Sequence, residues 1–127
     1  MARRLGSPDP TVVLSLMFPS TGPPRAQDPV RVAPAAFKEK LKNGRVRVLE
    51  YISYPGNRES MHSHSDALIY VVKGGKIRST DPMGNWVELE YNNGEVVWRP
   101  AVTHAVENMG KSTIHMIIVE IQETKLG

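Results

Sequence analysis

Short apolar runs separated by turn residues make up the chain after Gly44. Gly74-Gly75 predicts a tight hairpin, and turn residues also cluster at 55–57, 81–85 and 92–94. Between these turns the pattern predicts strands at 45–53, 67–73, 76–80, 86–91, 96–99, 103–108 and 113–122. Strands this short, at such regular spacing, are typical of an antiparallel sandwich or a small barrel. The pattern therefore predicts an all-β domain.

The chain before Gly44 has a different pattern. Seven of the ten prolines lie in the first 34 residues, where they break helices and discourage inner strands. We therefore predict a proline-rich extended N-terminal arm over 1–33 and the barrel domain over 34–127. The apolar stretch 12–18 is expected to pack on the body or on a neighbouring subunit, and a loose tail is the alternative.

One short helix is predicted at about 34–42. Pro34 stands at its start and Asn43-Gly44 at its end, and Phe37 and Leu41 are spaced to share one helical face. The sequence thus indicates a single helix in an otherwise β-rich chain.

Composition excludes several classes of protein. The 127 residues suit one domain, and 40% hydrophobic with 23% charged residues argues against gross disorder. No apolar run approaches the roughly 18 residues of a membrane-spanning helix. The net charge of +3 comes without a basic stripe, so neither nucleic acid nor a membrane is an expected partner. The chain has no cysteine, and its N-terminus lacks a clear secretion signal, so a cytoplasmic location is favoured.

The histidines carry the candidate chemistry. Of the four, His62 and His64 are two residues apart, so on a strand both point to the same face. His104 follows two predicted hairpins and can approach the same point from a facing strand. Neutral imidazole suits Fe, Mn, Ni, Cu or Zn. A His-x-His pair alone is weak evidence, and His115, which alternates with apolar residues of the last strand, is left out of the site.

The spacing around these histidines resembles the two motifs of the cupin superfamily. The first block is Gly56, five residues, His62-Ser63-His64, and an apolar strand that ends in Gly74-Gly75. The second is Gly94, five residues, Pro100, His104 and Asn108. The resemblance covers about 45–122. It implies a small stand-alone cupin: a double-stranded β-helix (cupin/jelly-roll) barrel, with His62, His64 and His104 as ligands of a divalent transition metal (Fe, Mn, Ni or Zn) in its mouth.

The departures from these motifs concern the fourth ligand. Cupins usually carry a glutamate where this chain has Ala67 or Leu68, and the glycine before the second-motif histidine is missing. Asp66 is the only nearby acid, but Ser65-Asp66 is more typical of a turn. The three-histidine part of the site therefore transfers and the carboxylate does not. Histidines held by hydrogen bonds and water, without a metal, remain the alternative.

Other residues have two readings each. In the cupin register Ala67, Ile69 and Val71 point inward. A ligand cavity or ordinary packing could use Tyr51, Met61, Tyr70, Met83 and Trp98. Arg99 could meet an acidic substrate at the mouth or lie in solvent, and Glu107 points away from His104.

Two functions stay open at this point. The first is a metal-dependent enzyme of dioxygenase, isomerase or lyase type that acts on a small polar metabolite, with catalytic residues unknown. No convincing general acid or base is visible beyond Asp66, Tyr51 or Tyr70. The second is a non-catalytic module that binds a small ligand without a tightly bound metal. A homodimer is expected in either case, because small barrels leave sheet edges that need cover.

Overall fold

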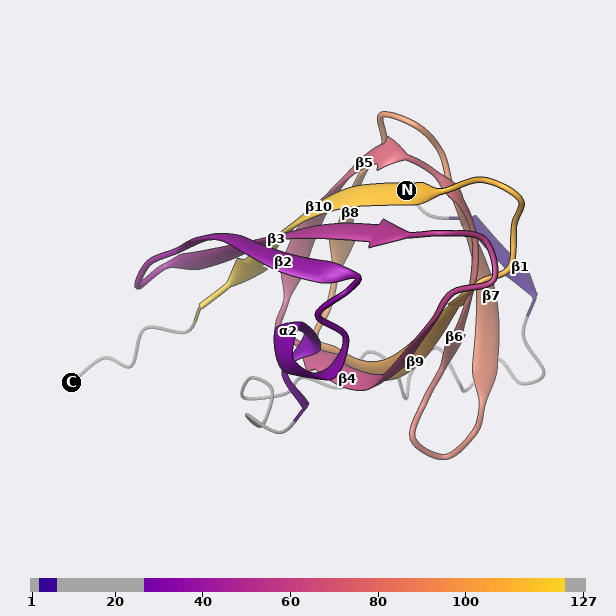
Figure 1. Cartoon of the computed structure of the whole chain (residues 1–127), viewed down its shortest axis with the longest axis horizontal. Coiled ribbons are helices and arrows are strands. Elements are labelled where there is room, and N and C mark those ends of the chain that lie inside the picture. Colours follow the sequence, from indigo (N-terminus) through magenta and orange to yellow (C-terminus); the bar gives the residue numbers. More distant parts are fainter. Residues whose placement is uncertain (1–2, 7–26, 123–127) are drawn as a thin grey trace.

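The fold is two antiparallel sheets facing each other. The structure is a computed structural model that describes residues 3–6 and 27–122 (Figure 1). Its elements are β1 (Arg3–Gly6), α2 (Pro29–Val32), β2 (Phe37–Lys42), β3 (Val46–Ser53), β4 (Arg58–His64), β5 (Ala67–Lys73), β6 (Gly75–Thr80), β7 (Trp86–Tyr91), β8 (Val96–Arg99), β9 (Val102–Asn108) and β10 (Ile114–Ile121).

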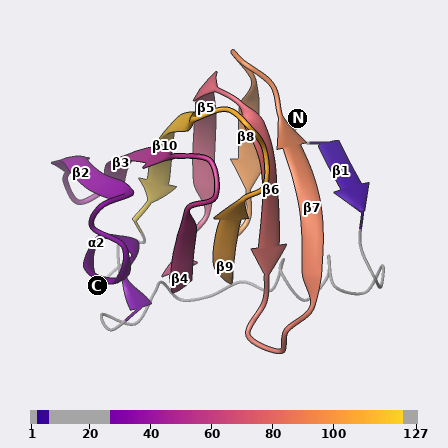
Figure 2. The ribbon, with the colours of Figure 1, turned by 45° about the vertical axis from the view of Figure 1, so that its right-hand side comes forward.

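Each sheet has five strands. Sheet A has the order β1-β7-β6-β9-β4, and sheet B has the order β2-β3-β10-β5-β8. After β3 the chain changes sheet between β3 and β4, β4 and β5, β5 and β6, β7 and β8, β8 and β9, and β9 and β10, and it stays in sheet A from β6 to β7 (Figure 2). This crossing of consecutive strands between two facing sheets is the jelly-roll arrangement. The predicted all-β barrel is confirmed.

Alternation along the strands builds the core. β3, β9 and β10 each bury every second residue, as expected for strands with one face inside. On β5 the residues Ala67, Ile69 and Val71 are buried, as predicted. Leu68 and Tyr70 on the same strand are about half exposed, at 42% and 48%. The interior between the sheets is therefore apolar, apart from the polar groups described below.

The predicted helix at about 34–42 is wrong. Residues 37–42 form β2, which pairs antiparallel with β3 and places Phe37 opposite Tyr51. Asn43 ends no helix: its Oδ1 accepts hydrogen bonds from the backbone N–H groups of Arg45 and Val46, at 2.8 and 2.9 Å, within the β2–β3 hairpin turn. These residues form a strand despite their helical spacing, because pairing with β3 and burial of Phe37 stabilise the extended conformation.

The short helix of the described chain lies earlier. Asp28 caps α2 by accepting a hydrogen bond from the N–H of Val30, at 3.1 Å, and Pro29 occupies the first turn. β1 is the edge strand of sheet A and pairs with β7. The segment 12–18 lies outside the described residues, so the boundary between an arm and a domain stays a prediction. No helix in residues 3–6 and 27–122 is long and apolar enough to cross a membrane.

Candidate metal centre

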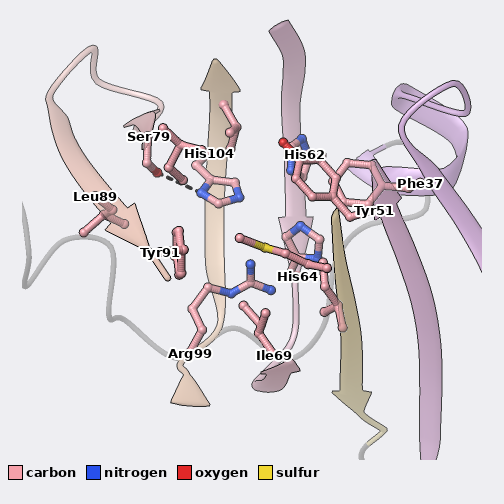
Figure 3. A pocket seen from close by; sticks show the side chains of 14 residues that line it. Phe37, Tyr51, His62, His64, Ile69, Ser79, Leu89, Tyr91, Arg99 and His104 are labelled. Carbon is pink, nitrogen blue, oxygen red and sulfur yellow. Dashed lines mark hydrogen bonds between the residues drawn. The ribbon is translucent and has the colours of Figure 1, made fainter. Parts of the chain in front are cut away.

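The structure brings the three predicted histidines together. His62 and His64 lie on β4, and His104 lies directly opposite His62 on the neighbouring β9. One ring nitrogen of each lies within 4.8 Å of those of the other two. All three are buried, with at most 5% of their surface exposed. Their rings meet edge to face around one point between the sheets (Figure 3).

Hydrogen bonds fix how each ring is turned. The Nδ1 of His62 lies 2.6 Å from the backbone carbonyl of Ser60, and the Nδ1 of His64 lies 2.6 Å from a carboxylate oxygen of Glu120. Both oxygens are acceptors, so each Nδ1 carries the proton and each Nε2 keeps a lone pair. His104 shares a 2.8 Å hydrogen bond between its Nδ1 and the Ser79 hydroxyl.

The remaining nitrogen of each ring is therefore the one available to a metal. The Nε2 of His62 is fully buried and has no hydrogen-bond partner among the described residues. A buried lone pair without a donor is costly in a protein interior. Nitrogen donors with their outer nitrogens held in this way fit a divalent transition metal.

Burial also keeps the imidazoles neutral. Desolvation, aided by the nearby charge of Arg99 and opposed by the hydrogen bond to Ser60, lowers the pKa of His62 to about 4. Burial likewise lowers the pKa of His64 and of His104 well below the usual value, with added repulsion from Arg99 and from neighbouring histidines. Neutral imidazole is the form that binds metals, so the cluster is ready to ligate at neutral pH.

Glu120 is a site residue that the sequence analysis missed. It lies on β10 in sheet B and reaches across the barrel to His64, with 1% of its surface exposed. Arg47 donates to its other oxygen at 3.0 Å, and the same guanidinium is held by both carboxylate oxygens of Asp28. The alternation along β10 could have pointed to Glu120, because every second residue of this strand faces inward and Glu120 follows Ile114, Met116 and Ile118 in that series.

The three histidines line a cavity of about 110 Å³ between the two sheets. Its walls are mainly apolar and aromatic: Phe37, Tyr51, Ile69, Ile77, Leu89, Tyr91, Val106, Met116 and Ile118, with Ser79 and Arg99. Phe37 packs against the rings of His62 and His64, at centroid distances of 5.1 and 5.5 Å. Of the residues considered as cavity lining from the sequence, Tyr51 and Arg99 do line it.

Other candidates lie elsewhere. Tyr70, Met83 and Trp98 are exposed on the outside of the protein, and Met61 is not in the cavity wall. Asp66 is exposed and accepts a hydrogen bond from the N–H of Ala101 at 2.7 Å, which fits its predicted place outside the site.

Two more polar residues are tied up away from the histidines. His115 lies 2.8 Å from Glu50 and Glu107 lies 3.5 Å from Arg58. Neither belongs to the histidine cluster, as the sequence analysis expected.

Comparison with known proteins gives the fold its name. Neither a protein-family profile nor a curated protein sequence matches the chain. Solved structures do: a cupin domain from Bordetella pertussis Tohama I is 27% identical, with a TM-score of 0.62 over 68% of this chain and 92% of that one. This chain is a small cupin. A cupin family protein from Methanocaldococcus jannaschii is 14% identical, with a TM-score of 0.53 over 68% of this chain and 79% of its own. A polyketide cyclase from Streptomyces resistomycificus is 20% identical, with a TM-score of 0.50 over 68% and 64%.

Of the two residues that could stand where cupins usually carry the motif glutamate, only Ala67 faces the interior. Leu68 points outward, whereas Ala67 is fully buried on the inner face of β5. In the register of sheet B, Ala67 lies between Glu120 on β10 and Arg99 on β8. The small side chain of Ala67 therefore lies between the carboxylate of Glu120 and the guanidinium of Arg99.

Proposed function

We propose that this cupin binds a divalent transition metal, Fe, Mn, Ni or Zn, through the Nε2 atoms of His62, His64 and His104. The convergence of these three buried imidazoles, with their Nδ1 atoms engaged behind them, supports the proposal most directly. A structural role for the histidines would instead leave the buried Nε2 of His62 without a partner.

We further propose that the metal serves a reaction on a small metabolite, of dioxygenase, isomerase or lyase type. Three protein donors leave coordination positions for water and substrate. When bound, the ion would polarise a carbonyl or carboxylate group or lower the pKa of a bound water. The apolar walls of the cavity exclude bulk water and strengthen polar interactions inside it.

The cavity side chains position a substrate rather than exchange protons with it. No carboxylate lines the cavity within the described part of the chain. The hydroxyl of Tyr51 is committed to the buried Glu59 at 2.6 Å, and burial, reinforced by that carboxylate, raises the pKa of Tyr51 well above its usual value. Tyr51 is therefore a poor base near neutral pH.

The same observation favours a second candidate function. A cavity without a general acid or base also suits a module that binds a small ligand and does not convert it. Metal content distinguishes the two, because the binding module would take its ligand in metal-free form.

The proposal is tested by metal analysis and calorimetry. The purified protein is loaded with Mn, Fe, Ni or Zn and its metal content measured, alongside the variants His62→Ala, His64→Ala and His104→Ala. The fourth histidine supplies the matched control, since His115 lies outside the cluster and pairs with Glu50. We expect one metal ion per chain in the wild type and in His115→Ala, and loss of binding in each cluster variant. Equal binding in wild type and His104→Ala would overturn the proposed metal site.

A further inference from the structure

Arg99 contributes a half-buried guanidinium to the wall of the cavity. It is the last residue of β8, and its side chain reaches inward beside His104 and His64 (Figure 3). Its Nε and Nη2 atoms are buried and form no hydrogen bond with any residue in the described ranges. A guanidinium that is always charged needs acceptors, and none of the described residues supplies one to Nε or Nη2.

Within residues 3–6 and 27–122, no carboxylate forms an ion pair with Arg99, although Glu120 attracts its charge from a distance. Glu120 is the nearest acid in the register of sheet B, two strands away across Ala67. Both oxygens of Glu120 are already used, one by Arg47 at 3.0 Å and the other by His64 at 2.6 Å. Tyr91 and the apolar side chains around Arg99 cannot neutralise it. The open face of the guanidinium is therefore directed at the contents of the cavity.

We propose that Arg99 binds the carboxylate of a small organic acid that occupies the cavity next to the three histidines. The planar fork of the guanidinium matches the two oxygens of a carboxylate, which supplies the missing acceptors. Only a contact between the same acid and the metal depends on the proposed function. Binding of the acid by Arg99 does not require the metal.

The cavity restricts the rest of the acid. The cavity, of about 110 Å³, favours a small ligand. Apart from Arg99, Ser79, two tyrosines and the histidines, the wall is apolar, with Phe37 and Met116 among its members. These features favour a short monocarboxylic acid with an apolar or aromatic body.

Charge couples this acid to the metal. A divalent cation on the histidines and the guanidinium of Arg99 repel each other inside a cavity of low polarity. A carboxylate between them removes this repulsion. Acid and metal should therefore bind cooperatively, each raising the affinity of the other by the same factor.

Calorimetric titration with propionate and benzoate tests the proposal. The neutral amides propionamide and benzamide are matched in shape, and the proteins are the wild type, Arg99→Met, Arg99→Lys and the control Arg58→Met, whose arginine side chain is 79% exposed. We expect at least one acid to bind the wild type and Arg58→Met, with the amides more than tenfold weaker. Arg99→Met should lose more than tenfold in acid affinity, and Arg99→Lys should keep part of it.

Metal titrations of the same proteins separate this proposal from the proposed function. Arg99→Met should bind Mn or Zn alone at least as tightly as the wild type, because a repelling charge is gone. Acid binding that is the same in Arg99→Met and wild type, or binding of neither acid, would overturn the role of Arg99 and leave the metal site intact. Loss of metal binding from every protein, with acid binding still dependent on Arg99, would instead overturn the proposed function.

A second variant serves as an internal test. Ala67→Glu places a carboxylate on the strand that lies between Glu120 and Arg99. If Arg99 is the anion site, this built-in carboxylate should compete and weaken propionate binding more than tenfold, whereas Ala67→Gln should weaken it less. Equal affinity for propionate in the two variants would count against the proposal.

Discussion

At the scale of single residues, the buried Glu120 determines how His64 presents its lone pair. The carboxylate accepts a hydrogen bond from the Nδ1–H of His64 at 2.6 Å and also accepts one from Arg47. Such outer partners fix the tautomer and the orientation of a ligand imidazole. The amide of glutamine has a similar shape but no charge, so it would hold the ring less firmly.

We therefore predict that Glu120→Gln lowers metal affinity by about 10- to 100-fold. Glu107→Gln, on the outer face of β9, is the matched control and should bind metal like the wild type. Isothermal titration of both variants with Zn checks the prediction. Unchanged affinity in Glu120→Gln would mean that the ring of His64 is held by packing alone.

The depressed pKa of His62 predicts a loss of stability in acid. Burial, aided by the charge of Arg99, lowers the folded-state pKa of His62 to about 4, against about 6.5 in the unfolded chain. Between these values the unfolded state binds more protons, so the metal-free protein loses stability as the pH falls below about 6.5. From pH 7 to pH 5 this single group should cost about 2 kcal/mol.

Urea unfolding in the presence of a chelator, at pH 7 and pH 5, measures this cost. The variant His62→Gln removes the titrating group and keeps a polar side chain. It also keeps the other titrating groups, including Glu59, whose pKa is raised by burial and which acts in the opposite direction. The wild type should lose about 2 kcal/mol more than His62→Gln over this interval. Equal losses in the two proteins would contradict the prediction.

At this scale the sequence predicts the histidines but not what surrounds them. Two of the histidines are two residues apart on one strand and the third lies in the second motif. This spacing can be recognised even when the ends of the strands are not known. The roles of Glu120 and Arg99 depend instead on the register of β10 and β8 against β5. Sequence separation does not reveal such register, so neither the contact with His64 nor the burial of the guanidinium could be predicted.

At the scale of elements, β2 shows how tertiary pairing overrides a local pattern. The charged run after Phe37 suits a helix, and also suits an exposed edge strand protected by lysines. In the strand, only Phe37 is buried, at 3% exposure, whereas Leu41 is 49% exposed beyond a shift in register. A helix would place both on one face.

Alanine substitutions on β2 separate these two possibilities. Phe37→Ala should destabilise the protein by about 3–5 kcal/mol, because its ring packs against Tyr51, His62 and His64. Leu41→Ala should cost less than about 1 kcal/mol, since half of its surface is already in water. Chemical denaturation measures both. Similar costs at the two positions would favour the helical arrangement instead.

The strands that are rich in apolar residues could be predicted from the sequence, whereas the polar strand could not. β5, β7 and β8 have the predicted bounds, because these runs end at Gly74, Asn92 and Pro100. β4 is not among the strands that the pattern predicts. Its inward positions carry Glu59, His62 and His64 rather than aliphatic side chains, and its pairing with β9 shifts register between Glu59 and His62. A polar strand of this kind signals a site instead of a core.

At the scale of the whole molecule, the site is assembled from both sheets. The three histidines belong to sheet A, whereas Phe37, Glu120 and Arg99 belong to sheet B. A ligand held by Arg99 and the metal would therefore join the two sheets across the cavity. Any such ligand should raise the melting temperature of the barrel progressively with ligand concentration, roughly as the logarithm of that concentration once it exceeds the dissociation constant.

The outer face of sheet B has an apolar patch that sheet pairing leaves open. Leu68 lies opposite Trp98, and Tyr70 lies opposite Val96, on the neighbouring strands β5 and β8. These four side chains are between 42% and 57% exposed. A contiguous apolar patch of this kind marks an interaction surface. It also borders the edge strand β8, whose outer backbone groups lie free of sheet partners in the described topology.

We therefore expect a homodimer in which this patch, formed by Leu68, Tyr70, Val96 and Trp98, meets its own copy about a two-fold axis. Such an isologous contact covers the apolar face and the β8 edge of both chains at once. Sedimentation velocity should give twice the mass of one chain for the wild type and one chain for Trp98→Arg. Met83→Arg is the matched control, because Met83 is 84% exposed but lies in the β6–β7 turn, and it should stay dimeric. A monomeric wild type would contradict the dimer.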